Sequence, residues 1–121
     1  MEDSSTKRDI KGLEKIIEYC DRIEEVITES GRDEDVFLEN YILQSSCAFS
    51  LVQIGELVKG LLRGGFCERH PGIEWNKIAR FRDVIVHHYG KIDLHLVWKT
   101  SVRLVPELRN QCEDILKDLK G

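Results

Sequence analysis

The chain has 121 residues, of which 41% are hydrophobic and 33% charged, and its net charge is −4 at neutral pH. This composition excludes a disordered chain and predicts one helical domain over residues 1–121. The negative net charge argues against generic nucleic-acid binding. Because no apolar run approaches ~18 residues and no secretory leader is visible, we expect a cytoplasmic protein.

The charge is unevenly distributed along the chain. Residues 1–62 have a net charge of −7 and residues 92–121 are neutral, whereas residues 63–91 carry six basic and three acidic side chains. This positive stretch contains residues 82–89, the segment with the most chemically versatile side chains.

The four cysteines are widely spaced and form no CxxC pair. In a cytoplasmic chain this pattern predicts buried or half-buried free thiols, with a zinc site as the less favoured alternative. We expect no metal and no cofactor. The cysteines are Cys20, Cys47, Cys67 and Cys112.

Apolar residues at steps of three and four predict a first helix, which begins at the cap candidates Asp3, Ser4 and Ser5 and ends at Ser30-Gly31. Its predicted buried face comprises Ile10, Leu13, Ile16, Ile17, Cys20, Ile23, Val26 and Ile27. A second helix is predicted from about Asp33 to Leu62. At roughly 45 Å it is long for a small domain, so we expect a bend near Gly55 or contact with a partner chain.

After Gly64-Gly65, residues 64–74 are predicted to form a loop. A third helix is expected from Trp75 to His88 with Gly90 as its stop, and a fourth from a cap at Asp93 to about Leu119. Pro106 should kink or split this last helix. The predicted fold class is all-α, an antiparallel bundle of four to five helices, with two long helices and shorter ones.

One segment gathers the chemically versatile side chains: Arg82-Asp83-Val84-Ile85-Val86-His87-His88-Tyr89. The apolar residues expected to face inward are Ile78, Phe81, Val84 and Ile85, which would leave the polar set exposed. On a helix, Arg82 and Tyr89 share a face, and Asp83 can touch His87. Arg82 and His87 lie roughly 140° apart, so their convergence requires a distorted helix end or a second copy across a two-fold axis.

These residue types suit phosphodiester cleavage. An imidazole can exchange a proton near neutral pH, and a guanidinium can hold phosphate oxygens bidentately. In RNA the 2′-hydroxyl is an internal nucleophile, so the reaction needs no metal. Spacing alone, however, favours the ordinary interpretation: a solvated helix end or a simple anion contact.

The spacing Arg82-(four residues)-His87-(one residue)-Tyr89 resembles the RX4HXY signature of HepT-type toxins, a family within the HEPN ribonuclease superfamily. Further segments agree with this family. Ile54-Gly55-Glu56 resembles its IGE motif, Trp75 and Ile78 its W-x2-I lead-in, and the stretch from Asp93 through Val97-Trp98 to Pro106 its closing helix. The resemblance covers residues 10–118.

The resemblance implies an all-helical homodimer with the active site at the interface, and metal-independent endoribonuclease activity with Arg82 and His87 as catalytic residues. It also implies a toxin–antitoxin system, whose antitoxin is an MntA-type nucleotidyltransferase. That partner would transfer AMP to Tyr89 and silence the toxin. The added phosphate would occupy the anion site beside Arg82 and repel RNA.

Several positions depart from the family pattern or lack an assigned role. Asp83 stands where many relatives have Asn; it could orient His87 or weaken RNA binding. Arg80 adds positive charge, and His88 receives no role. We interpret Glu56 as a structural carboxylate on a buried helix, pairing with an arginine or a backbone donor across the bundle.

Two other functions remain open. The chain could be a noncatalytic helical adaptor that binds a nucleotidyltransferase or a nucleotide, which its net acidity favours, or a structural dimerisation bundle. Cleavage of RNA by the unmodified chain would distinguish the ribonuclease toxin from the adaptor and from the dimerisation bundle.

Overall fold

The computed structural model describes residues 4–87 and 91–121, and within these ranges all regular structure is helical. This confirms the all-α class. The elements in chain order are α1 (Ser4–Glu29), α2 (Glu34–Leu38), α3 (Tyr41–Arg63), α4 (Phe66–Arg69), α5 (Trp75–His87), α6 (Leu94–Lys99), a π-helical segment (Thr100–Leu104) and α7 (Val105–Lys120).

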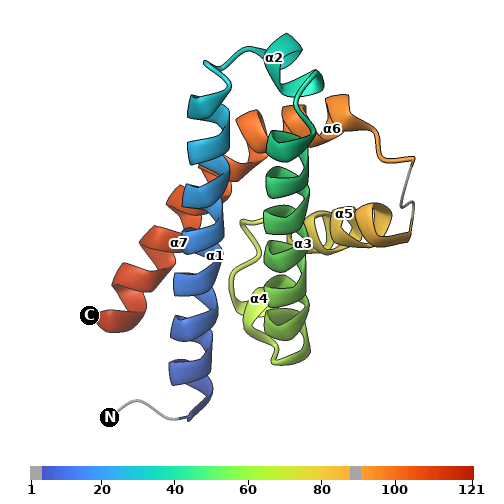
Figure 1. Cartoon of the computed structure of the whole chain (residues 1–121). Coiled ribbons are helices and arrows are strands. Elements are labelled where there is room, and N and C mark those ends of the chain that lie inside the picture. The colour runs from blue at the N-terminus through green and yellow to red at the C-terminus, as the bar shows by residue number, and fades with distance from the viewer. Residues whose placement is uncertain (1–3, 88–90) are drawn as a thin grey trace.

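The long helices α1 and α3 lie side by side and run in opposite directions, with α7 packed against α1 (Figure 1). The predicted buried face of α1 is confirmed, since all its members except Ile17 are buried. Helix α5 does not extend the antiparallel pattern: it lies across α3 (Figure 1). The end of α5 therefore projects beyond the α1–α3 layer.

The prediction of one continuous second helix is wrong. This segment is divided into α2 and α3 at Asn40, whose side-chain oxygen accepts hydrogen bonds from the N–H groups of Ile42 and Leu43 at 3.0 and 3.1 Å. Because this cap satisfies the first free N–H groups of α3, the helix restarts there instead of continuing. The expected bend at Gly55 is absent, and α3 is a single helix through that residue.

The predicted loop 64–74 is also wrong in part, because it contains the short helix α4. Phe66 of α4 is buried and packs edge-on against Trp75, at 5.9 Å between ring centroids. The indole N–H of Trp75 donates to the carbonyl of His70 at 2.8 Å. These contacts fix the start of α5 and therefore the placement of the residues that follow.

Pro106 splits the last helix, as predicted. It lies in the first turn of α7, directly after the π-helical segment, in which the N–H of Val105 bonds to the carbonyl of Thr100. Proline has no N–H for the helical ladder, and a wider turn is one way to accommodate the change of register.

The four cysteines are buried free thiols, as predicted. Within residues 4–87 and 91–121, no helix is long and apolar enough to cross a membrane.

Candidate functional site

The site lies where α5 crosses α3. Gly55 of α3 faces Arg82 of α5 so closely that a Cβ on residue 55 would stand 2.1 Å from the Cβ of Arg82 and 2.7 Å from its Cγ. No ordinary side chain fits in this space. Glycine at the centre of the Ile54-Gly55-Glu56 motif thus has a physical reason: it lets the backbone of α3 approach the arginine.

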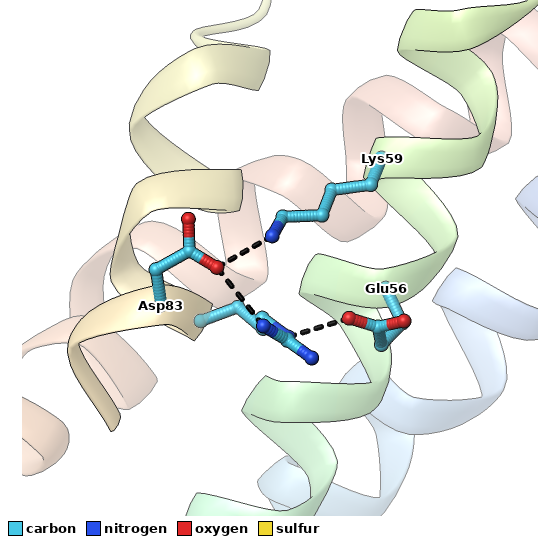
Figure 2. A network of polar contacts seen from close by, with 4 residues as sticks. Glu56, Lys59 and Asp83 are labelled. Carbon is cyan, nitrogen blue, oxygen red and sulfur yellow. Dashed lines mark hydrogen bonds and ion pairs between the residues drawn. The ribbon is translucent and has the colours of Figure 1, made fainter. Parts of the chain in front are cut away.

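Four charged side chains alternate in sign across this crossing (Figure 2). The Nε of Arg82 lies 2.5 Å from Oε1 of Glu56, and its Nη1 donates to Oδ1 of Asp83 at 3.0 Å. The same Oδ1 accepts from Nζ of Lys59 at 2.5 Å. Glu56 and Lys59 come from α3, whereas Arg82 and Asp83 come from α5, so the network joins the two helices.

The guanidinium of Arg82 is held on one side and open on another. Its side chain is 22% exposed, and its Nε is buried. The N–H at Nε is not aligned for a hydrogen bond to Glu56, so this contact is an ion pair only. Nη2 takes no part in these contacts. Arg82 is therefore positioned by protein carboxylates while keeping donor capacity for an anion such as a phosphate.

The carboxyl group of Asp83 has a pKa below its ordinary value. The hydrogen bond from Lys59 is the largest cause, followed by that from Arg82. Both cations favour the charged form. Asp83 therefore remains a carboxylate at neutral pH and ties the two cations together.

Lys59 was absent from the sequence-based prediction. The sequence offered one indication of its role: Lys59 stands three residues after Glu56, so both side chains lie on neighbouring parts of one helix surface. Glu56 fulfils its predicted pairing with an arginine across the bundle. It is not buried, however, because its side chain is 48% exposed.

His87 lies at the exposed C-terminal end of α5. In the part of the chain that the structure describes it has no hydrogen-bond or ion-pair partner, and Asp83 contacts Lys59 and Arg82 instead. Because α5 is a regular α-helix through His87, the roughly 140° separation from Arg82 stands. The structure does not bring Arg82 and His87 together within one chain.

Two expectations about the faces of α5 are wrong. Val84 was expected to face inward but is 44% exposed, and Arg82 is not on the exposed side. The reason is that Arg82 lies on the buried side with Trp75 and Ile78, so Val84, two residues later, turns away from α3. Ile78 and Ile85 are buried as predicted, and Phe81 is half-buried.

The remaining predicted residues are placed as follows. Arg80 is exposed on the same side of α5 as His87, seven residues earlier. His88, Tyr89 and Gly90 lie outside the described residues. Within the described ranges, no group of three or more His, Cys, Asp or Glu side chains is arranged to hold a metal ion.

The chain is similar in sequence to proteins named as ribonucleases. Residues 16–115 match the protein family described as "Ribonuclease HepT-like". A protein of Methanocaldococcus jannaschii named "Putative RNase MJ1216" is 34% identical, over 95% of this chain and 93% of its own length. A protein of Caldanaerobacter subterraneus subsp. tengcongensis named "Putative RNase TTE0752" is 32% identical, over 89% of this chain and 94% of its own length.

A third relative, from Thermococcus cleftensis, is named "Probable ribonuclease HepT"; it is 30% identical over 87% of this chain and 93% of its own length. No solved structure matches the chain. The family match covers most of the described chain, including the α3–α5 crossing, and it confirms the resemblance and the nuclease class inferred from the sequence. The chain belongs to the HepT-like ribonuclease family.

Proposed function

We propose that the chain is an endoribonuclease that cleaves RNA without a metal ion, with Arg82 and His87 as its catalytic residues. The observation that carries this proposal is the fixed position of the Arg82 guanidinium at the α3–α5 crossing. The carboxylates of Glu56 and Asp83 contact it, and Gly55 lets the two helices approach closely there. A pre-positioned guanidinium stabilises charge that develops on a phosphate in the transition state.

The reaction follows from the chemistry of RNA. The 2′-oxygen attacks the neighbouring phosphorus and loses its proton to a neutral imidazole, while the bond from phosphorus to the 5′-oxygen breaks. A protonated imidazole gives its proton to that leaving oxygen. Arg82 binds the phosphate oxygens through this exchange, and His87 supplies the imidazole.

A homodimer completes the site in this proposal. Since Arg82 and His87 diverge on one helix, a two-fold axis beside α5 would place His87 of one copy against Arg82 of the other. Exposed apolar side chains on the helices that carry the site support such an interface. On α3 they are Tyr41, Ile42 and Phe49, and on α5 they are Val84 and Val86.

We further propose that the protein is the toxin of a toxin–antitoxin system and that an MntA-type nucleotidyltransferase silences it by transferring AMP to Tyr89. In the sequence, Tyr89 stands two residues after His87 and seven after Arg82. Continuation of the helical spacing would place the added phosphate beside the guanidinium. There it would compete with RNA for the same donors.

A cleavage assay tests the catalytic proposal. The purified chain, shown by mass spectrometry to be unmodified, is incubated with RNA in EDTA beside Arg82→Ala and His87→Ala. We expect cleavage by the parent and losses of about 10²–10³-fold for Arg82→Ala and about 10²–10⁴-fold for His87→Ala. Absence of cleavage by the unmodified parent would refute the proposal and favour the noncatalytic adaptor.

Mixing the two inactive variants tests the shared site. Mixed dimers that combine Arg82 of one copy with His87 of the other should regain part of the parent activity after subunit exchange. Failure to regain activity, with exchange verified, contradicts a site built across the interface. Each variant alone, taken through the same exchange procedure, is the control, because neither alone combines Arg82 with His87.

The silencing proposal has a separate test. Incubation with the nucleotidyltransferase and ATP should raise the mass by whole AMP units, and Tyr89→Phe should prevent the gain. An unchanged parent mass, with the transferase shown to be active on another substrate, would exclude this mechanism.

A further inference from the structure

A second feature suited to an anion lies between the first turns of α1 and the last turns of α3, at the end of the molecule where these helices lie side by side (Figure 1). It is a groove of about 530 Å³. Three of its lining side chains are cations: Arg8, Lys11 and Arg63. This concentration of positive charge contrasts with the net charge of −4 of the whole chain.

The three cations are uncommitted. Among the residues that the structure describes, none of them pairs with a carboxylate, and Arg8 only reaches the hydroxyl of Ser5 at 3.5 Å. The acidic residue of the lining, Asp9, is paired with Arg69 at 3.3 Å. Among the described lining residues, three unpaired cations therefore stand against one carboxylate, which is itself paired with Arg69.

The glycines in the lining present no side chain to the groove. A Cβ on Gly60 would find no atom closer than the Nη2 of Arg63 at 3.9 Å, and one on Gly64 would find only backbone oxygens at 3.8 Å. No lining residue that the structure describes is aromatic. A ligand would thus meet cations, glycine backbone and the aliphatic side chains of Leu57 and Leu61, with no aromatic surface on which a base could stack.

The groove lies beside the last turns of α3, which follow the residues of α3 that hold Arg82. Glu56, which holds Arg82, shares a helix face with Gly60 and Arg63, because these residues are spaced by four and seven. The rise from residue 56 to residue 63 is about 10.5 Å, which corresponds to roughly three stacked nucleotides at ~3.4 Å each.

We propose that this groove binds the sugar–phosphate backbone of the RNA strand a few nucleotides from the cleaved bond, with Arg8, Lys11 and Arg63 contacting successive phosphates. The proposal rests on the proposed ribonuclease function and adds a substrate subsite to it. Because phosphate contacts carry no sequence information, the subsite increases affinity without selecting a sequence.

Binding is measured separately from cleavage. Fluorescence anisotropy is recorded with a labelled single-stranded RNA 12-mer whose 2′-hydroxyls are all methylated, so that it cannot be cleaved through them. The groove variant is Arg8→Gln/Lys11→Gln/Arg63→Gln. The control variant, Lys99→Gln/Arg103→Gln/Lys117→Gln, makes the same change in net charge on α6, the π-helical segment and α7.

We expect the groove variant to bind RNA at least about tenfold more weakly. The plot of log K against log salt concentration should also become shallower, with the magnitude of its negative slope reduced by about 2, at ~0.7 per lost phosphate contact. The control variant should keep the parent's slope. Cleavage of a ribodinucleotide, too short to reach the groove, should be unchanged in the groove variant. The single variant Lys11→Gln should reduce the magnitude of the slope by ~0.7. If the triple variant does not fold, this single variant provides the test.

Equal losses of affinity in the groove and control variants would overturn the proposal, because net charge alone would then explain binding. Tighter binding of a labelled oligoglutamate than of RNA would also overturn it, in favour of an acidic protein segment. Absence of dinucleotide cleavage by the parent would refute the ribonuclease proposal instead, and the anisotropy measurements would still decide on the groove.

Discussion

Gly55 of α3 and Arg82 of α5 approach each other more closely than any other residue type at position 55 would permit. A Cβ there would stand 2.1 Å from the arginine Cβ. The candidate site therefore depends on one missing side chain, because the short distance between the helices is what brings Glu56 and Lys59 within reach of α5.

Gly55→Ala should separate α3 from α5. Overfilling a packed contact costs about 1–3 kcal/mol, against a helix-propensity gain of ~1 kcal/mol, so we expect a lower free energy of unfolding by urea together with weaker RNA cleavage. Gly60→Ala is the matched control in the same helix. Its Cβ would meet only the Nη2 of Arg63, at an ordinary 3.9 Å, so it should raise the free energy of unfolding by up to ~1 kcal/mol. Equal changes in the free energy of unfolding at the two positions would contradict the close approach.

Glu56→Gln should loosen Arg82 without removing it. The ion pair to Nε is lost, and misplacement of a catalytic group lowers kcat by between about 10- and 100-fold. KM for RNA should not rise, because a negative charge beside the phosphate site is removed. Steady-state kinetics check this split, with Glu68→Gln on α4 as a control of equal charge change. A higher KM with unchanged kcat would contradict a positioning role.

Asp83→Asn should lower the melting temperature at neutral pH, because Lys59 and Arg82 lose their shared carboxylate. The pKa of Asp83 is lowered in the folded protein, so its contribution to stability is present above the ordinary aspartate pKa of ~3.9 and is lost as the pH falls through the lowered folded value. The difference in melting temperature between parent and variant should be constant from about pH 5 to 8 and shrink below about pH 4. The exposed Asp114→Asn is the control; a difference that persists in acid would refute the ion-pair explanation.

The cysteines should be inert in the folded protein. Burial raises the pKa of Cys47 and Cys67 to about 11 and that of Cys112 to about 12, and it also raises the pKa of Cys20. Since the thiolate is the reactive form, iodoacetamide at pH 8 should leave the native mass unchanged and add four groups in denaturant. Rapid labelling of any cysteine in the native protein would contradict its burial.

Helix formation was largely readable from the sequence, because it depends on local patterns. The face of α1, its end near Gly31, the start of α2 near Asp33 and the split at Pro106 follow from periodicity and from residues with strong backbone preferences. The break at Asn40 was missed, although its capping chemistry is equally local, because the apolar pattern continues across it.

The sequence by itself determined the all-α class, the family and the segment that carries Arg82 and His87, since these follow from spacing along the chain. Only the tertiary structure decided which way Arg82 faces, because the buried side of α5 depends on where it crosses α3. The same crossing added Lys59 to the site and exposed Val84, whereas the regular helical geometry of α5 keeps His87 apart from Arg82. Contacts between helices far apart in sequence depend on packing geometry, which no local pattern contains.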